Sequence, residues 1–189
     1  WKNSSLGKTA LLVEGARRIG KSTIVEEFAK NEYKSYILID FTKVSDTVKN
    51  LFNDISDLDY LFLQLQLIYK TDLYKRESLI IFDEVQKFPR AREAIKYLVK
   101  DGRYHYIETG SLISIKKKSQ EIVIPSEEDK RKMYPMDFEE FLWATGDNVT
   151  APFIKDCFEK RIPMGDKLHR KIMTTFRTYF AIGGMPQVI

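Results

Sequence analysis

Residues 15–22 read GARRIGKS, and this stretch decides the fold. It fits the pattern G-x-x-x-x-G-K-[ST] and lies between an apolar run that predicts a strand, residues 9–15, and a run with helical spacing, residues 21–31. Glycine at both ends of the loop permits backbone dihedrals that turn successive amide N–H groups inward at a helix N-terminus. The concave anion site formed in this way fits a polyphosphate.

The motif predicts which residues of the loop contact the nucleotide and which of them have a further role. Lys21 is expected to reach the β- and γ-phosphates of ATP, and the Ser22 hydroxyl is expected to ligate Mg²⁺. Arg17 and Arg18 occupy variable positions of the motif, so we expect them to be exposed to solvent and assign them no catalytic role. The residues expected to contact the nucleotide are Gly15, Ala16, Arg17, Arg18, Ile19, Gly20, Lys21, Ser22 and Thr23.

A second motif ends the strand predicted over residues 78–84, SLIIFDE. An apolar run that ends in two acids at the carboxyl end of a strand is typical of a Walker B motif. Asp83 is expected to hold Mg²⁺ through water, and Glu84 is expected to orient and polarise the attacking water. The pair indicates hydrolysis of ATP rather than phosphate transfer. By itself an acidic pair after a strand is more often the start of a solvated loop, and the loop at residues 15–22 is what favours the catalytic interpretation.

The segment ETGS, residues 108–111, ends the next predicted strand. Thr109 or Ser111 is predicted to act as a sensor that hydrogen-bonds the γ-phosphate or the attacking water, and capping of the following segment is the alternative. A complete site also needs an arginine for the charge that develops on the transferred phosphoryl group. Arg131 and Arg103 are the candidates, with surface ion pairing as the alternative for each, and we keep Arg131.

Strands alternate with helices along the chain, which predicts an α/β fold. The predicted strands are residues 9–15, 35–41, 78–84 and 103–110, with a fifth strand ending near residues 133–134 and a shorter β-like run at residues 121–124. The predicted helices are residues 21–31, a helical stretch within 44–70, a helix after Pro89, a helix opened by the capping pair Asp137 and Glu140, and residues 165–181. Continuously apolar strands are typical of a parallel sheet covered on both faces. We therefore expect a three-layer P-loop NTPase fold with a mainly parallel five-stranded sheet and the start of a helical C-terminal lid.

The pattern also predicts a boundary between a core and a helical part. Residues 1–135 are expected to form the nucleotide-binding core, and residues 136–189 a helical segment that completes the ATPase domain, truncated before a further C-terminal domain. The side chains expected to face inward on the core helices are Ile24, Val25, Phe28, Leu58, Leu61, Phe62, Leu65, Ile68, Ala94, Tyr97 and Leu98.

Composition places the chain among soluble globular proteins. Apolar residues make up 43% of the 189 residues and charged residues 31%, close to the average for that class. The single cysteine, Cys157, excludes a disulfide within the chain, and the cytoplasm is the expected compartment. The apolar stretches are too short to span a bilayer, so we expect no membrane insertion.

The net charge of +4 is small, and part of it comes from KKK at residues 116–118 and KRK at residues 130–132. Short basic runs can contact nucleic acid, which makes DNA or RNA a possible partner. A solvated loop is the favoured alternative, because the excess of positive charge is small for a dedicated nucleic-acid binder.

The ordered set GARRIGKS, IIFDEVQ, ETGS, YPMDFEEF and GGMPQV resembles a prokaryotic family of AAA+-type ATPases over almost the whole chain. Its more particular features are Gln86, two residues behind the acidic pair, the segment YPMDFEEFL and the terminal GG-x-P. The residues to which the resemblance carries nucleotide and sensor roles are Gly15, Gly20, Lys21, Ser22, Asp83, Glu84 and Thr109 or Ser111. Many members of that family have Gly-Arg before the fifth strand, where this chain has EEDKRKM, so the role of Arg131 stays open.

Members of that family join the nucleotide-binding domain to a C-terminal domain related to restriction-endonuclease-like folds, so a similar domain is expected outside this chain. The predicted function is hydrolysis of ATP with Mg²⁺, coupled to a conformational change. The alternative is a slow nucleotide-dependent switch that acts through partner domains. AAA+ proteins often complete their sites between subunits, which makes a homo-oligomer possible. A small-molecule kinase is the third possibility, but the sequence shows neither an acceptor pocket nor an arginine-rich lid.

Overall fold

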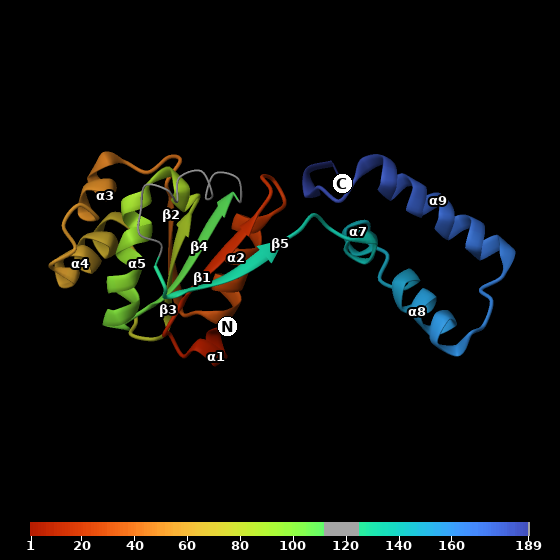
Figure 1. Ribbon diagram of the computed structural model, residues 1–189, viewed down its shortest axis with the longest axis horizontal. Helices are drawn as coiled ribbons and strands as arrows, with labels where there is room; N and C mark the ends of the chain where they lie inside the picture. Colours follow the sequence, from red (N-terminus) through yellow and green to blue (C-terminus); the bar gives the residue numbers. More distant parts are fainter. Residues whose placement is uncertain (112–124, 189) are drawn as a thin grey trace. The chain divides into compact units, whose positions relative to one another are not determined.

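The computed structural model describes residues 1–111 and 125–188 (Figure 1). Within these residues, five strands form one sheet in the order β2-β3-β4-β1-β5, and each neighbouring pair is parallel. The strands are β1 (Ala10–Gly15), β2 (Ser35–Asp40), β3 (Ser78–Asp83), β4 (His105–Ser111) and β5 (Glu128–Met133). The predicted α/β fold with a parallel five-stranded sheet is confirmed. The β-like run predicted at residues 121–124 lies outside the described residues.

Helices follow the strands as the alternating pattern predicts. The helices of the first part of the chain are α1 (Lys2–Ser5), α2 (Lys21–Glu32), α3 (Asp46–Leu51), α4 (Leu58–Tyr69), the short 3-10 helix η1 (Val85–Lys87) and α5 (Pro89–Asp101). Those of the last part are α7 (Phe138–Ala144), α8 (Thr150–Lys160), α9 (Asp166–Ile182) and the 3-10 helix η2 (Pro186–Val188).

The sheet is the middle of three layers, because successive side chains of each strand point to opposite faces. On one face, Ile80 and Phe82 of β3 pack in a core with α3, α4 and α5. On the other face, Leu79 and Ile81 of the same strand pack with α2. Figure 1 shows α3, α4 and α5 on one side of the sheet and α2 on the other. We call these the α5 face and the α2 face. This layering is the one expected of a P-loop NTPase.

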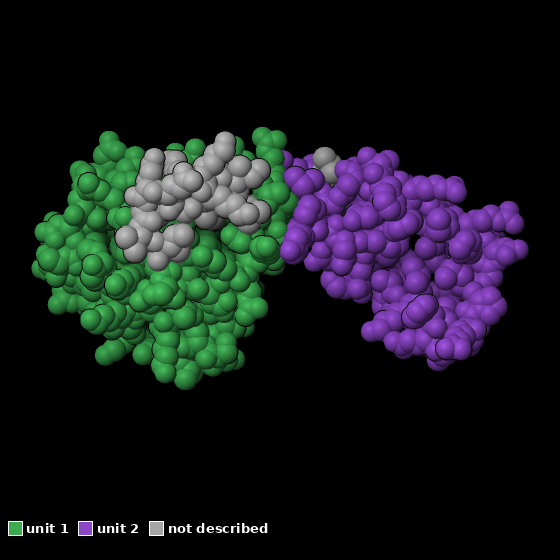
Figure 2. Space-filling model, in the orientation of Figure 1, with its two compact units in different colours: residues 1–133 green, residues 134–189 purple. Residues whose placement is uncertain are grey.

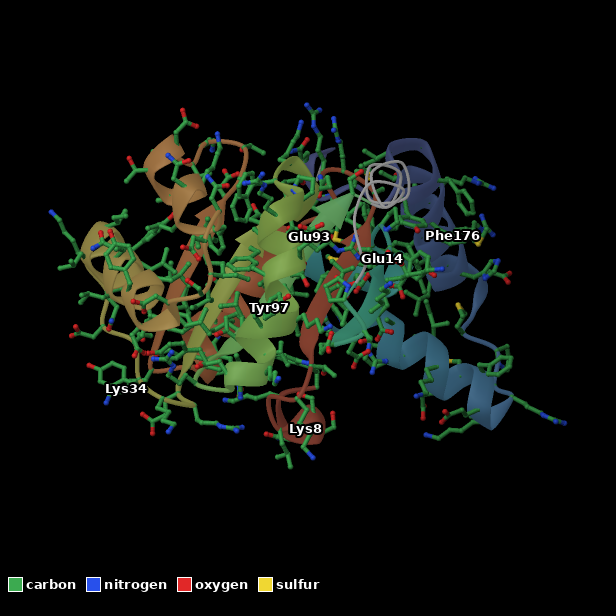
Figure 3. All side chains as sticks on the ribbon, turned by 60° about the vertical axis from the view of Figure 1, so that its left-hand side comes forward. Lys8, Glu14, Lys34, Glu93, Tyr97 and Phe176 are labelled. Atoms are coloured by element: carbon green, nitrogen blue, oxygen red, sulfur yellow. The ribbon has the colours of Figure 1, made fainter. Side chains whose placement is uncertain are left out.

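Three side chains predicted to face inward are exposed instead. Ile24 on α2 is 55% exposed, Tyr97 on α5 (Figure 3) is 53% exposed and Ile68 on α4 is 40% exposed. In α5 the buried stripe runs through Ala91, Ala94, Ile95, Leu98 and Val99. Each of the three misplaced residues lies outside the buried stripe of its own helix. The interpretation was wrong because apolar character was taken for position on the buried face.

The chain divides into two compact units, residues 1–133 and residues 134–189 (Figure 2). In the second unit Asp137 and Glu140 form the predicted capping box that opens α7. The ring of Phe138 on α7 packs edge-on against Phe176 of α9, with 4.9 Å between the centroids. The Met136 N–H donates to the Gly184 carbonyl at 2.8 Å, and a Cβ at residue 184 would lie 2.0 Å from the Met136 oxygen. Only glycine permits this approach, which ties the end of α9 back to the start of the unit.

Candidate functional site

The loop between β1 and α2 needs glycine at both ends. A Cβ at residue 15 would lie 2.3 Å from the Met133 carbonyl oxygen of β5, so a larger residue would push the two strands apart. Gly20, the N-cap of α2, has φ of 91°, a left-handed conformation that glycine adopts without strain. The loop therefore enters α2 with its backbone N–H groups at the positive end of a twelve-residue helix. Such an arrangement favours binding of an anion.

Lys21, the first residue of α2, is buried, with 4% of its surface exposed. Its Nζ donates to the Ala16 carbonyl oxygen at 2.7 Å and to the Gly15 carbonyl oxygen at 3.4 Å. Burial lowers the pKa of Lys21, and the carboxylates of Glu84 and Asp83 oppose that shift. The ammonium group thus lies inside the loop on neutral carbonyl oxygens, and charged phosphate oxygens would be stronger partners for it.

Asp83 ends β3, and two hydroxyl groups converge on its carboxylate. Ser22 Oγ donates to Asp83 Oδ1 at 2.7 Å, and Thr109 Oγ1 donates to the same oxygen. The parallel register sets Phe82 opposite Glu108, so Asp83 and Thr109 follow at adjacent positions of neighbouring strands. Ser22 comes from the first turn of α2. The P-loop helix, β3 and β4 therefore meet at this carboxylate.

The oxygen atoms at this point fit a magnesium ion held jointly by protein and nucleotide. Hard oxygen ligands suit Mg²⁺, which is usually bound by one or two protein groups together with phosphates and water. Ser22 and Asp83 provide a hydroxyl and a carboxylate within 2.7 Å of each other. In the described part of the chain no group of three or more His, Cys, Asp and Glu side chains could hold a metal ion by itself. The predicted metal ligands thus suit a shared site rather than a closed protein cage.

Glu84 follows Asp83 in a left-handed conformation, with φ of 53° and ψ of 44°. Non-glycine residues rarely adopt this region, and at functional sites it re-aims a side chain. The Glu84 N–H donates to Thr109 Oγ1 at 3.1 Å, and the carboxylate accepts a hydrogen bond from Gln86 Nε2. Gln86 was predicted only as a feature of the family resemblance, without a role in the site. Its place two residues after Glu84 was the signal that it contacts Glu84.

The other predicted contacts of the loop differ in exposure. Ala16, Arg17, Arg18 and Thr23 are exposed, and Ile19 is buried. Exposure of both arginines agrees with their variable positions in the motif. Ser111, the second candidate sensor, is buried at the end of β4, and the register sets it opposite Gly15. Thr109 is the candidate that the structure brings to Asp83 and Glu84.

The two candidate arginines are not brought to this cluster within the chain. Arg131 lies in the middle of β5, where it pairs with Asp129 at 3.4 Å, and it lines a hollow of about 570 Å³ beside α2. Arg103 precedes β4 and pairs with Asp101 at 2.8 Å and with Asp59. Since Thr109 lies near the opposite end of that strand, Arg103 has a structural role in this unit.

A second polar cluster, which the sequence did not predict, lies on the α5 face. Arg92 of α5 is 2% exposed and binds Glu128 of β5 through two hydrogen bonds of 2.7 Å each. Glu108 of β4 is fully buried, and neither of its carboxyl oxygens has a hydrogen-bond partner among the described residues. Burial raises the pKa of Glu108 well above its usual range, and the negative charge of Glu128 adds to that rise. Burial of Glu108 favours its neutral form.

Two of the three cations in the basic run at residues 130–132 lie near acids. Lys130 lies 3.7 Å from Glu128, and Arg131 pairs with Asp129. The run at residues 116–118 lies outside the described residues. Among those that are described, no helix is both long and apolar enough to cross a membrane.

Comparison with known proteins adds one match. The profile of a family described as "AAA domain" matches residues 7–142, a stretch that contains the loop, all five strands and most of α7. A search of curated proteins found no match.

Proposed function

The chain belongs to this family of AAA-type P-loop ATPases, and from that premise we propose that it binds ATP with Mg²⁺ and hydrolyses it to ADP and phosphate. One observation carries the proposal: Asp83 accepts hydrogen bonds from Ser22 of the loop helix and Thr109 of β4, while Glu84 extends directly beyond it. Family membership supports nucleotide binding, and this cluster supplies the groups that hydrolysis needs.

Binding begins at the loop. Backbone N–H groups between Gly15 and Lys21 receive the β- and γ-phosphates, and Lys21 exchanges the carbonyl oxygen of Ala16 for phosphate oxygens. Ser22 and Asp83 would hold Mg²⁺, which would neutralise negative charge on the phosphate oxygens when bound. The Ser22 hydroxyl can ligate Mg²⁺ through a lone pair even though it now donates to Asp83.

Hydrolysis requires a water oriented for in-line attack. Glu84 accepts a hydrogen bond from this water and thereby directs an oxygen lone pair toward the γ-phosphorus. A bond forms from water to phosphorus, the bond from phosphorus to the bridging oxygen breaks, and ADP leaves with that electron pair. The water protons pass to Glu84 and the released phosphate. Thr109 fixes the direction of Glu84, because its hydroxyl accepts from the Glu84 N–H and donates to Asp83.

The remaining parts of the proposal concern coupling and assembly. Residues 134–189 are proposed to act as a helical lid and to pass the nucleotide state on to a further C-terminal domain. Arg131 is exposed on β5, the edge strand of the described sheet. In this proposal it serves the site of a neighbouring subunit, so a homo-oligomer would complete the ATPase.

A slow nucleotide-dependent switch is the alternative, and the position of Lys21 favours it. Its ammonium group is turned onto the loop carbonyl groups of Ala16 and Gly15. This contact must change before the phosphates bind, which suits an enzyme that is gated by a partner.

The test is steady-state phosphate release with ATP and Mg²⁺, with nucleotide binding measured in parallel. Glu84→Gln should retain ATP binding and lose turnover, by roughly 100-fold or more. Lys21→Ala should lose both, because it removes a phosphate contact. Glu93→Gln, the same exchange at an exposed position of α5, is the matched control and should behave like the parent chain. Binding without any turnover by the parent chain would favour the switch, and absence of ATP binding would overturn both proposals.

A further inference from the structure

The turn after β3 folds Gln86 back toward Glu84. The left-handed Glu84 ends the strand, and the Lys87 N–H donates to its carbonyl at 2.8 Å to close η1. Val85, fully buried, anchors this turn in the core of the α5 face. The side chains of residues 84 and 86 are therefore held beside each other by the backbone.

The contact between these two side chains has a defined direction. Gln86 Nε2 donates to Glu84 Oε2. Rotation of the amide by half a turn would set its oxygen against the carboxylate, and two acceptors repel each other. The observed amide orientation therefore presents a donor to the Glu84 carboxylate.

The other end of the Gln86 amide has no comparable partner. Gln86 is 4% exposed, and its Oε1 is buried without a hydrogen-bond partner among the described residues. A buried polar atom left unpaired costs stability, so a side chain kept only for packing would be apolar here. Within the described residues, the side chain of Gln86 donates its hydrogen bond to the carboxylate that is proposed to polarise water.

We propose that Gln86 is a positioning residue for ATP hydrolysis, which holds the Glu84 carboxylate in the direction needed for attack by water. The amide occupies Oε2 and leaves Oε1 of Glu84 to face the attacking water. This role rests on the proposed hydrolysis. Gln86 would thus support hydrolysis together with Asp83 and Glu84, although it is proposed to contact neither the nucleotide nor the metal.

The test uses two replacements of similar size. Gln86→Met keeps most of the volume and removes the amide, and Gln86→Glu is isosteric but repels Glu84. We expect kcat to fall about 10-fold in Gln86→Met and further in Gln86→Glu, with KM and ATP affinity unchanged. Gln64→Met on α4 makes the same exchange far from the site in sequence and should leave kcat unchanged. The thermal midpoint of Gln86→Met should equal or exceed that of the parent, because an unpaired buried acceptor is lost.

A double-mutant cycle separates positioning from a general structural effect. In a Glu84→Gln background, Gln86→Met should cause no further loss of the residual turnover, because Gln86 acts through Glu84. An equal loss in both backgrounds, an unchanged or higher kcat in Gln86→Met, or a lowered thermal midpoint in proportion to the lost activity would overturn the positioning role alone. A parent chain without turnover would overturn this role together with the proposed function.

Discussion

Glu108 and Thr109 are neighbours on β4, yet they serve opposite faces of the sheet. On the α2 face, Thr109 shares its hydroxyl between Asp83 and the N–H of Glu84. On the α5 face, Glu108 is buried without a partner among the described residues, near the ion pair of Arg92 and Glu128. Strand alternation separates the two environments by a single residue.

The difference shows how one strand carries function and stability separately. On the α2 face, Asp83 and Thr109 lie where β3 and β4 end beside the loop. Each is hydrogen-bonded to a group that a magnesium nucleotide would also contact. On the α5 face, the ion pair of Arg92 and Glu128 joins α5 to β5 beneath the helix layer. Variants on the α2 face should therefore change turnover, whereas variants on the α5 face should change the free energy of unfolding.

The largest expected effect is on stability. Arg92→Met leaves Glu128 buried without its cation, which should lower the free energy of unfolding by about 3–5 kcal/mol in urea denaturation. The double variant Arg92→Met with Glu128→Met should recover most of the loss, because a buried ion pair can be replaced by apolar side chains. Lys96→Met, at an exposed position of α5, is the control. A loss below about 1 kcal/mol in Arg92→Met would show that the pair is not a structural element.

An intermediate effect is expected on turnover. Thr109→Val keeps the shape of the side chain but removes the donor to Asp83 and the acceptor for the Glu84 N–H. We expect kcat for phosphate release to fall about 100-fold, the usual loss for one polar contact in a catalytic site. Thr109→Ser retains the hydroxyl and should keep most of the activity. Equal activity in the valine and serine variants would contradict the role given to the hydroxyl.

The smallest effect is a change in how stability depends on pH. The raised pKa of Glu108 means that the folded chain keeps a proton that the unfolded chain releases above about pH 4.3. Stability should therefore fall as pH rises from about 4.3 toward the raised pKa, because the folded state binds more protons in that window. Glu108→Gln should remove this slope and raise the free energy of unfolding at pH 7, because the buried side chain then has no proton to lose. Identical urea midpoints for parent and variant from pH 5 to 8 would refute a protonated Glu108.

Residues that obey local rules could be predicted from the sequence. The loop spacing identified Lys21 and Ser22, and the apolar run before the acids identified Asp83, because phosphate binding fixes both patterns. The capping box at Asp137 followed from residue types that satisfy the first N–H groups of a helix.

Residues that depend on tertiary neighbours could not be predicted. Glu108 and Arg92 are charged, and charged side chains are rarely buried unless another chain segment pairs with them. Whether Thr109 or Ser111 approaches Asp83 depends on where β4 sits in its register with β3, since both residues point to the same face. Tyr97 was misplaced because its apolar ring gives no sign of which side of α5 it occupies.

The most direct test compares two carboxylate-to-amide exchanges on the two faces. Magnesium-dependent ATP hydrolysis should be lost in Asp83→Asn and retained in Glu108→Gln, because only Asp83 is proposed to hold Mg²⁺. Activity retained in Asp83→Asn, or lost to the same extent in both variants, would contradict the placement of the catalytic site on the α2 face.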